Sequence, residues 1–171
     1  ADANAAKTDN GSTALMCASL NGHSGIVPLL LAAGANVNAA RTDDGFTALM
    51  WASEKGHSDI VPLLLSAGAN VNAAKTDNGG TALMGASANG HSGIVPLLLS
   101  AGANVNAAKT DDGFTALMWA SQNGHSGIVP LLLSAGANVN AARTDDGFTA
   151  LMLASQNGHS GIVPLLLSAG A

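Results

Sequence analysis

The sequence predicts an all-α repeat solenoid of stacked helix-turn-helix units with projecting β-hairpin loops. Three observations predict this fold. Equivalent residues recur every 34 positions along the whole chain, and the short apolar segments inside each period end at glycine. Apolar residues make up 47% of the chain, which is enough for a core. One such period cannot bury its apolar face alone, so neighbouring periods must share that core.

Five units fill the chain and form one solenoid over residues 1–171. Unit one to unit five span about 8–41, 42–75, 76–109, 110–143 and 144–171. We expect no dedicated capping units, because the first and last units carry the same apolar motif as the internal ones.

The elements follow in order within unit two. Thr47 is expected to cap the first helix, which begins at Ala48 and ends at Gly56, a residue suited to a left-handed cap. Ser58 is expected to cap the second helix, with Pro62 tolerated in its first turn and Gly68 after its end. The polar stretches that follow predict an extended turn with its arms at 69–72 and its tip at 76–79.

These residues resemble the ankyrin repeat. The resemblance rests on the G-x-T-x-L-x-x-A stretch, the Gly-His pair and the leucine triplet with its trailing Gly-Ala-Asn-Val-Asn, which in unit two are Gly45–Ala52, Gly56-His57, Leu63–Leu65 and Gly68–Asn72. It implies helix pairs with a projecting hairpin, and protein binding through the hairpin tips and the inner helix face. The chain has Ala48 and Met50 where the family has proline and histidine, and its period exceeds the usual 33 residues by one.

The units differ at eight of their 34 positions, which concentrates the variation on the hairpin and the first helix. Matching positions line the concave groove in ankyrin repeats, so the resemblance makes them partner-binding candidates. The alternative is that the aromatic side chains pack between units. The candidates are Phe46, Trp51, Glu54, Lys55, Gly80, Gly85, Ala88, Phe114, Trp119, Gln122, Phe148, Leu153 and Gln156.

The variable residues also predict a hollow at unit three. Units two and four carry aromatic residues at the positions where unit three has Gly80 and Gly85. We expect Trp51 and Trp119 to stand on either side of this hollow and to make the strongest contacts with a partner protein or peptide.

Charge and composition argue against several partners. The net charge is −5 and the six basic residues are scattered, so no basic stripe is available for nucleic acid or an anionic membrane surface. There is one cysteine, Cys17, and no signal-peptide pattern, which leads us to expect a cytoplasmic protein.

No motif for catalysis, metal or cofactor binding is expected. The five histidines occupy equivalent slots, too far apart to share a zinc ion, and each is expected to bond the neighbouring hairpin. The aspartates at the hairpin tips are expected to form turns beside basic residues, and near-identical units offer no asymmetric catalytic constellation.

The ends suggest a second function. Without capping units, apolar residues such as Leu166 and Leu167 are expected to be exposed, so copies could stack head-to-tail into a filament. The near-identity of the units has two possible origins, recent duplication and design from a consensus.

Overall fold

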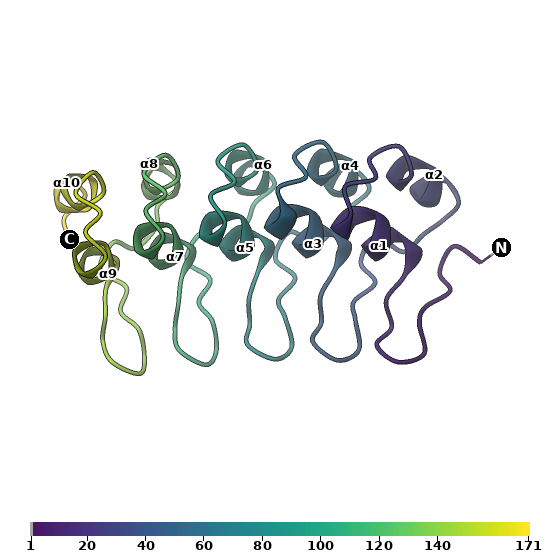
Figure 1. Cartoon of the computed structure of the whole chain (residues 1–171), viewed down its shortest axis with the longest axis horizontal. Coiled ribbons are helices and arrows are strands. Elements are labelled where there is room, and N and C mark those ends of the chain that lie inside the picture. The colour runs from purple at the N-terminus through teal and green to yellow at the C-terminus, as the bar shows by residue number, and fades with distance from the viewer. Residues whose placement is uncertain (1) are drawn as a thin grey trace.

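The computed structural model describes residues 2–171, and within them ten helices stack in successive pairs. The first helices of the units form one row and the second helices another, while the loops project from the side of the first row (Figure 1). No helix in the described part of the chain is long and apolar enough to cross a membrane. The helices are α1 Ala14–Leu20, α2 Val27–Ala32, α3 Ala48–Lys55, α4 Val61–Ser66, α5 Ala82–Ala88, α6 Val95–Ser100, α7 Ala116–Gln122, α8 Val129–Ser134, α9 Ala150–Gln156 and α10 Val163–Ser168.

The first helix of each unit begins at its threonine cap as the sequence predicts, and in unit two it also ends at the predicted glycine. In the other four units an asparagine caps the end of this helix, and the left-handed glycine comes one residue later. The hydroxyl of Thr47 accepts a hydrogen bond from the backbone N–H of Met50 at 3.3 Å, and Thr47 itself is extended. This bond satisfies one of the N–H groups that a helix leaves open at its start. Gly56 has a φ of 82° and donates its N–H to the carbonyl of Ala52, which closes the helix.

The prediction that Ser58 caps the second helix was wrong. Helix α4 begins at Val61, and its N-cap Ile60 is already in the helical region without a side-chain cap. The N–H groups of Ile60 and Val61 both donate to the carbonyl of His57. Ser58 therefore lies within a turn that has already started, and Pro62 lies in the first turn of the helix, where its missing N–H leaves no bond unmade.

The projecting loops are narrow and are tied to one another. Each is closed by one antiparallel bridge, such as that between Ala40 and Thr47, rather than by a continuous ladder. The tips of adjacent loops are connected, because the N–H of Thr76 donates to the carbonyl of Asp44 at 2.9 Å. The side chain of Asn72 adds a second connection by donating to the carbonyl of Gly102, which follows the second helix of the next unit.

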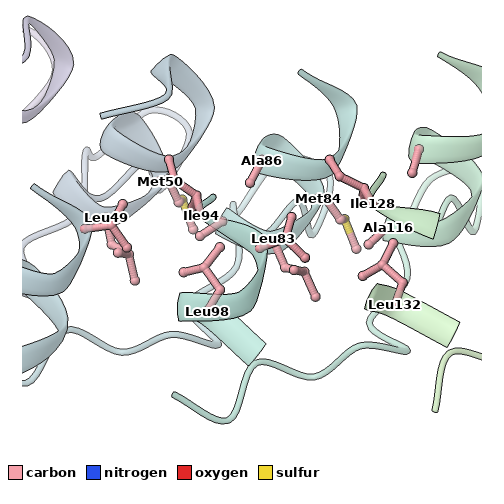
Figure 2. Close-up of a cluster of buried hydrophobic side chains, with 14 of the residues drawn as sticks. Leu49, Met50, Leu83, Met84, Ala86, Ile94, Leu98, Ala116, Ile128 and Leu132 are labelled. Carbon is pink, nitrogen blue, oxygen red and sulfur yellow. The ribbon is translucent and has the colours of Figure 1, made fainter. Parts of the chain in front are cut away.

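The core is continuous from unit to unit. In Figure 2 the side chain of Met50, from unit two, lies beside Ile94 of unit three, and Met84 lies beside Ile128 of unit four. All four side chains are no more than 4% exposed. Met50 and Met84 thus pack across the junctions between consecutive units.

The first and last units of residues 1–171 each have one face without a neighbouring unit. Ile26 is 46% exposed although its counterpart Ile60 is fully buried, and Met152 is 51% exposed although Met118 is buried. Leu167 is also exposed, as expected. The expectation for Leu166 was wrong, because this side chain points into the core of its own unit and is fully buried.

Candidate functional site

A pocket of about 210 Å³ lies at unit three, where the variable residues predict a hollow. We call it the central pocket. It lies across the first helices of units two, three and four and is bounded on one side by the loops. Its lining comprises Phe46, Met50, Glu54, Lys75, Asn78, Gly80, Thr81, Met84, Gly85, Ala88, Asn89, Lys109 and Trp119.

Missing side chains create the central pocket. In units two and four, a phenylalanine from the loop packs against the tryptophan of the same unit: Phe46 stacks on Trp51 with ring centroids 4.1 Å apart, and Phe114 lies tilted against Trp119 with centroids 4.4 Å apart. Unit three has Gly80 and Gly85 at the same two positions, so the volume of one aromatic pair is left open there.

Gly85 is not required by the backbone. It lies within α5, and a Cβ atom built on it would be 3.5 Å from the Cβ of Glu54, which is ordinary van der Waals contact. Glycine inside a helix is less stable than alanine by roughly 0.5–1 kcal/mol. The glycine therefore leaves space on the floor of the pocket at a cost in helix stability.

The aromatic residues are less exposed than the groove interpretation requires. Phe46 and Phe114 are buried, 8% and 4% exposed, whereas Trp51 and Trp119 are half-buried. The next loop covers both of these phenylalanines, since the Lys75 ammonium lies 4.7 Å from the ring centre of Phe46 and the Arg143 guanidinium 5.0 Å from that of Phe114. The alternative of packing between units thus describes the phenylalanines better.

Other candidates lie outside the central pocket. Leu153 is 3% exposed, so the expectation that it lines an open groove was wrong. Its unit has no tryptophan and its side chain packs into the core instead. Lys55 is exposed beside Trp51, 5.9 Å from the ring centre. Five further candidates are absent from the pocket lining: Trp51, Phe114, Gln122, Phe148 and Gln156.

Three charged side chains line the central pocket. The ammonium group of Lys75 is 3.3 Å from Asp77, and that of Lys109 is 3.2 Å from Asp111, so the two lysines present mainly their alkyl stems to the pocket. Glu54 approaches from the helix side and pairs with Lys55 at 3.6 Å. The pocket wall is therefore mixed: aromatic, methionine and small side chains lie beside Glu54, Asn78 and Asn89, and the basic groups are held by carboxylates.

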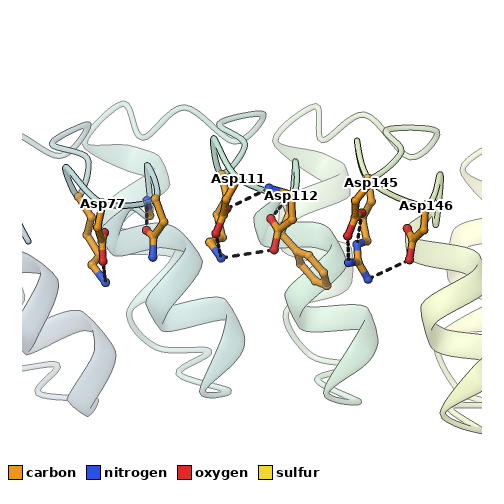
Figure 3. Close-up of polar contacts among 11 residues, drawn as sticks. Asp77, Asp111, Asp112, Asp145 and Asp146 are labelled. Carbon is orange, nitrogen blue, oxygen red and sulfur yellow. Dashed lines mark hydrogen bonds and ion pairs between the residues drawn. The ribbon is translucent and has the colours of Figure 1, made fainter.

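The loops carry an excess of acidic groups. Figure 3 shows Asp77, Asp111, Asp112, Asp145 and Asp146 in a row along the loop tips. We call the loops 41–46, 75–80, 109–114 and 143–148 the loop edge; it holds seven aspartates and four basic residues, a net charge of −3.

The basic groups of the loop edge are tucked inward. The side chain of Lys109 is 16% exposed, against 51% for its partner Asp111. The Arg143 guanidinium lies 5.0 Å from the ring centre of Phe114, and its ion pair holds the pKa of the Asp145 carboxyl below the ordinary 3.8. The aspartates also form turns, as predicted: Asp44 accepts from the N–H of Phe46 at 3.0 Å. The outermost charges of this edge are consequently negative.

The histidines join units, but not through the hairpin. The Nε2 of His57 lies 3.0 Å from the carbonyl oxygen of Leu20, the last residue of α1, and Nε2 of His91 lies 2.9 Å from that of Glu54. The prediction of a bond to the neighbouring hairpin was therefore wrong. A carbonyl can only accept, so Nε2 donates. The histidine ring also occupies the space beside the equivalent glycine of the preceding unit: a Cβ atom built on Gly56 would lie 2.6 Å from the ring of His91.

Two comparisons with known proteins bear on this arrangement. A family model described as "Ankyrin repeats (3 copies)" matches residues 1–75, 41–109 and 83–171, so its overlapping matches cover the chain from end to end. A search of curated proteins finds no match.

Proposed function

The chain belongs to the ankyrin repeat family, and on this premise we propose that it is a scaffold that binds a protein or peptide partner in the central pocket. Ankyrin repeats are generally protein–protein interaction modules and are typically not enzymes. The pocket and its surroundings supply the specific surface for this general role.

The location of the variation carries the proposal. Residues that join units, including the methionines and histidines, are the same in all five units, whereas most of the residues that line the pocket differ between units. The differences at Gly80, Gly85 and Ala88 all remove side-chain volume at one place. A concave, largely apolar site with a few polar groups is the usual form of a binding site.

A peptide-library selection tests this function. The immobilised chain is exposed to a library of random peptides in parallel with the variant Gly85→Trp, which gives unit three the residue that units two and four have. We expect the wild type to retain peptides that the variant does not retain, because the tryptophan fills the pocket floor.

The matched control is Gly93→Asp, which gives unit three the residue that unit two has at Asp59, at a site with open space around it. This variant should retain the same peptides as the wild type. A selection in which every retained peptide also binds Gly85→Trp would refute the central pocket as the site.

Head-to-tail self-association is a second candidate function. The observation that favours it is the complementarity of the two end faces of residues 1–171. Ile26 and Leu29 are exposed on one, and Met152 and Leu167 on the other, whereas the counterparts Ile60 and Met118 are buried. Within the array the methionine of one unit packs against the isoleucine of the next, as Met50 does against Ile94. A second copy would bury the same kinds of residue.

Sedimentation over a range of concentrations tests this candidate. Met152→Lys should lower the association constant, because a charge would enter an apolar junction. Ser168→Lys, at an exposed position on the same unit, serves as the control. A wild type that stays monomeric at all concentrations would exclude the candidate.

A further inference from the structure

We infer that the central pocket takes one bulky apolar side chain, flanked on the partner by lysine or arginine residues that meet the loop edge. This inference rests on the proposed function and specifies the chemistry of the partner. It follows from the size of the pocket, the character of its wall, and the charges that surround it.

The size of the pocket matches a single side chain. Its volume is about 210 Å³, whereas sites for whole drug-sized ligands span about 300–1,000 Å³. The space corresponds to the residues that unit three lacks, namely the aromatic side chains of units two and four. An aromatic or large aliphatic side chain on a partner would occupy the same kind of space.

The wall selects an apolar occupant. Trp119 offers a half-exposed aromatic surface, Met50 and Met84 add polarizable thioethers, and Gly85 allows close approach to the backbone. A cation inside the pocket would find its natural partners already engaged: the ammonium of Lys75 lies over the Phe46 ring, and the Glu54 carboxylate pairs with Lys55 at 3.6 Å.

The charges around the pocket select a basic flank. Lys75 and Lys109 are each held by aspartates of their own loop, while the side chains of Asp77 and Asp111 remain 45% and 51% exposed. The three loops that contribute to the pocket lining, 41–46, 75–80 and 109–114, hold five aspartates and three basic residues, a net charge of −2. A partner with lysine or arginine on either side of its apolar residue would complement this edge, and an acidic partner would be repelled.

Tryptophan fluorescence provides a direct readout at the pocket. The chain has two tryptophans, so Trp51→Phe leaves Trp119 as the sole reporter and keeps an aromatic ring against Phe46. Three short peptides are titrated into this variant: phenylalanine between lysine pairs, serine between lysine pairs, and phenylalanine between glutamate pairs.

The lysine-flanked phenylalanine peptide should bind best. We expect its affinity to exceed that of the serine peptide about tenfold, from burial of the ring. It should exceed that of the glutamate-flanked peptide about three- to tenfold, from the exposed charges. Equal binding of the serine peptide would overturn the apolar anchor, and equal or tighter binding of the glutamate peptide would overturn the basic flank.

Two variants in the same background locate the interaction. Gly85→Leu, which gives unit three the residue that unit five has at Leu153, should lower the affinity of the lysine-flanked phenylalanine peptide about tenfold. The double variant Asp77→Asn, Asp111→Asn should lower it about three- to tenfold. Asp9→Asn, at the matching position of unit one, should leave it unchanged.

The outcomes separate this inference from the proposed function. If none of the three peptides binds, or if Gly85→Leu has no effect, the inference fails. The proposed function still stands if the library selection yields pocket-dependent peptides of another composition, for example acidic ones. It fails together with the inference only if no selected peptide depends on Gly85.

Discussion

Unit three and unit two share the same threonine N-caps and the same kind of histidine bond to the preceding unit, yet they present opposite surfaces. Unit two fills its inner face with Phe46 stacked on Trp51, and unit three leaves the same two positions to Gly80 and Gly85. Unit four repeats the filled arrangement, so the central pocket lies between two filled units.

This difference teaches that a binding site can arise by omission. The backbone of unit three is held by Thr81, which caps α5, and by His91, which bonds the carbonyl of Glu54. Neither contact involves the missing side chains. The scaffold therefore tolerates the loss of an aromatic pair that would leave an internal cavity in a single globular core.

The largest expected effect concerns the filled units. Phe114→Ala should lower the free energy of unfolding by about 3 kcal/mol, because a buried aromatic side chain is removed. Phe148→Ala should cost clearly less, since no following loop covers that ring and it is half-buried. Urea denaturation measures both. Equal losses would show that the next loop does not bury the phenylalanine.

The second effect separates the two tryptophans. Trp119 lines the central pocket and Trp51 does not. Trp119→Ala should weaken binding of a pocket-dependent peptide by about 2 kcal/mol, roughly thirtyfold. Trp51→Ala should change the affinity less than about threefold. Calorimetric titration measures both affinities, and a larger loss for Trp51→Ala would move the site toward unit two.

A smaller effect concerns the floor of the pocket. Gly85→Ala should raise the free energy of unfolding by about 0.5–1 kcal/mol, because alanine favours the helix and its Cβ meets no clash. Gly79→Ala is the contrasting variant: its φ is +72°, and a Cβ there would lie 3.0 Å from Thr110. It should lower stability. If both substitutions stabilise the chain, Gly85 does not differ from a glycine at positive φ in what the backbone requires.

The smallest effect is a pH dependence at the rim of the pocket. Burial is the largest single influence on the pKa of the Asp111 carboxyl and raises it, but the hydrogen bond and charge of Lys109 together with backbone N–H groups outweigh burial, and the net pKa lies below the ordinary 3.8. Because its pKa is lowered, the Asp111 carboxylate stays charged at every pH above this lowered pKa. It loses its charge only as the pH falls through the lowered pKa. Asp111 should therefore contribute equally to binding from about pH 7.5 to pH 4.5.

The measurement is the affinity ratio of wild type to Asp111→Asn for the lysine-flanked phenylalanine peptide. Because the pair is exposed, this ratio should be about two to three. It should approach one only below the ordinary pKa of 3.8. A ratio that already declines between about pH 6 and pH 5 would contradict the direction of the shift.

The repeat made most of the fold predictable from the sequence. Thr47 suits the N-cap of a short helix and Gly56 suits its left-handed C-cap, and the structure has both residues in these positions. The hollow at unit three followed from comparing units within one chain. These inferences succeeded because each depends on the type of residue at a fixed offset.

The failures depend on spatial detail that spacing does not contain. Ser58 has the chemistry of a cap, but the turn starts at His57 and leaves it no free N–H to accept from. His57 bonds a helix end rather than a hairpin, a choice between two nearby backbone groups. Phe46 is buried because the next loop lies over it, and the sequence does not state how closely adjacent loops approach.

The histidine bonds have a consequence for how such a chain can change over generations. Their acceptors are backbone carbonyls of residues whose side chains differ between units: Leu20, Glu54, Ala88 and Gln122. Every amino acid supplies that carbonyl. A mutation at these positions therefore changes the side chain on the surface and leaves the hydrogen bond between units in place. Recognition and architecture are thereby encoded in different atoms of the same residue, and selection can act on one without disturbing the other.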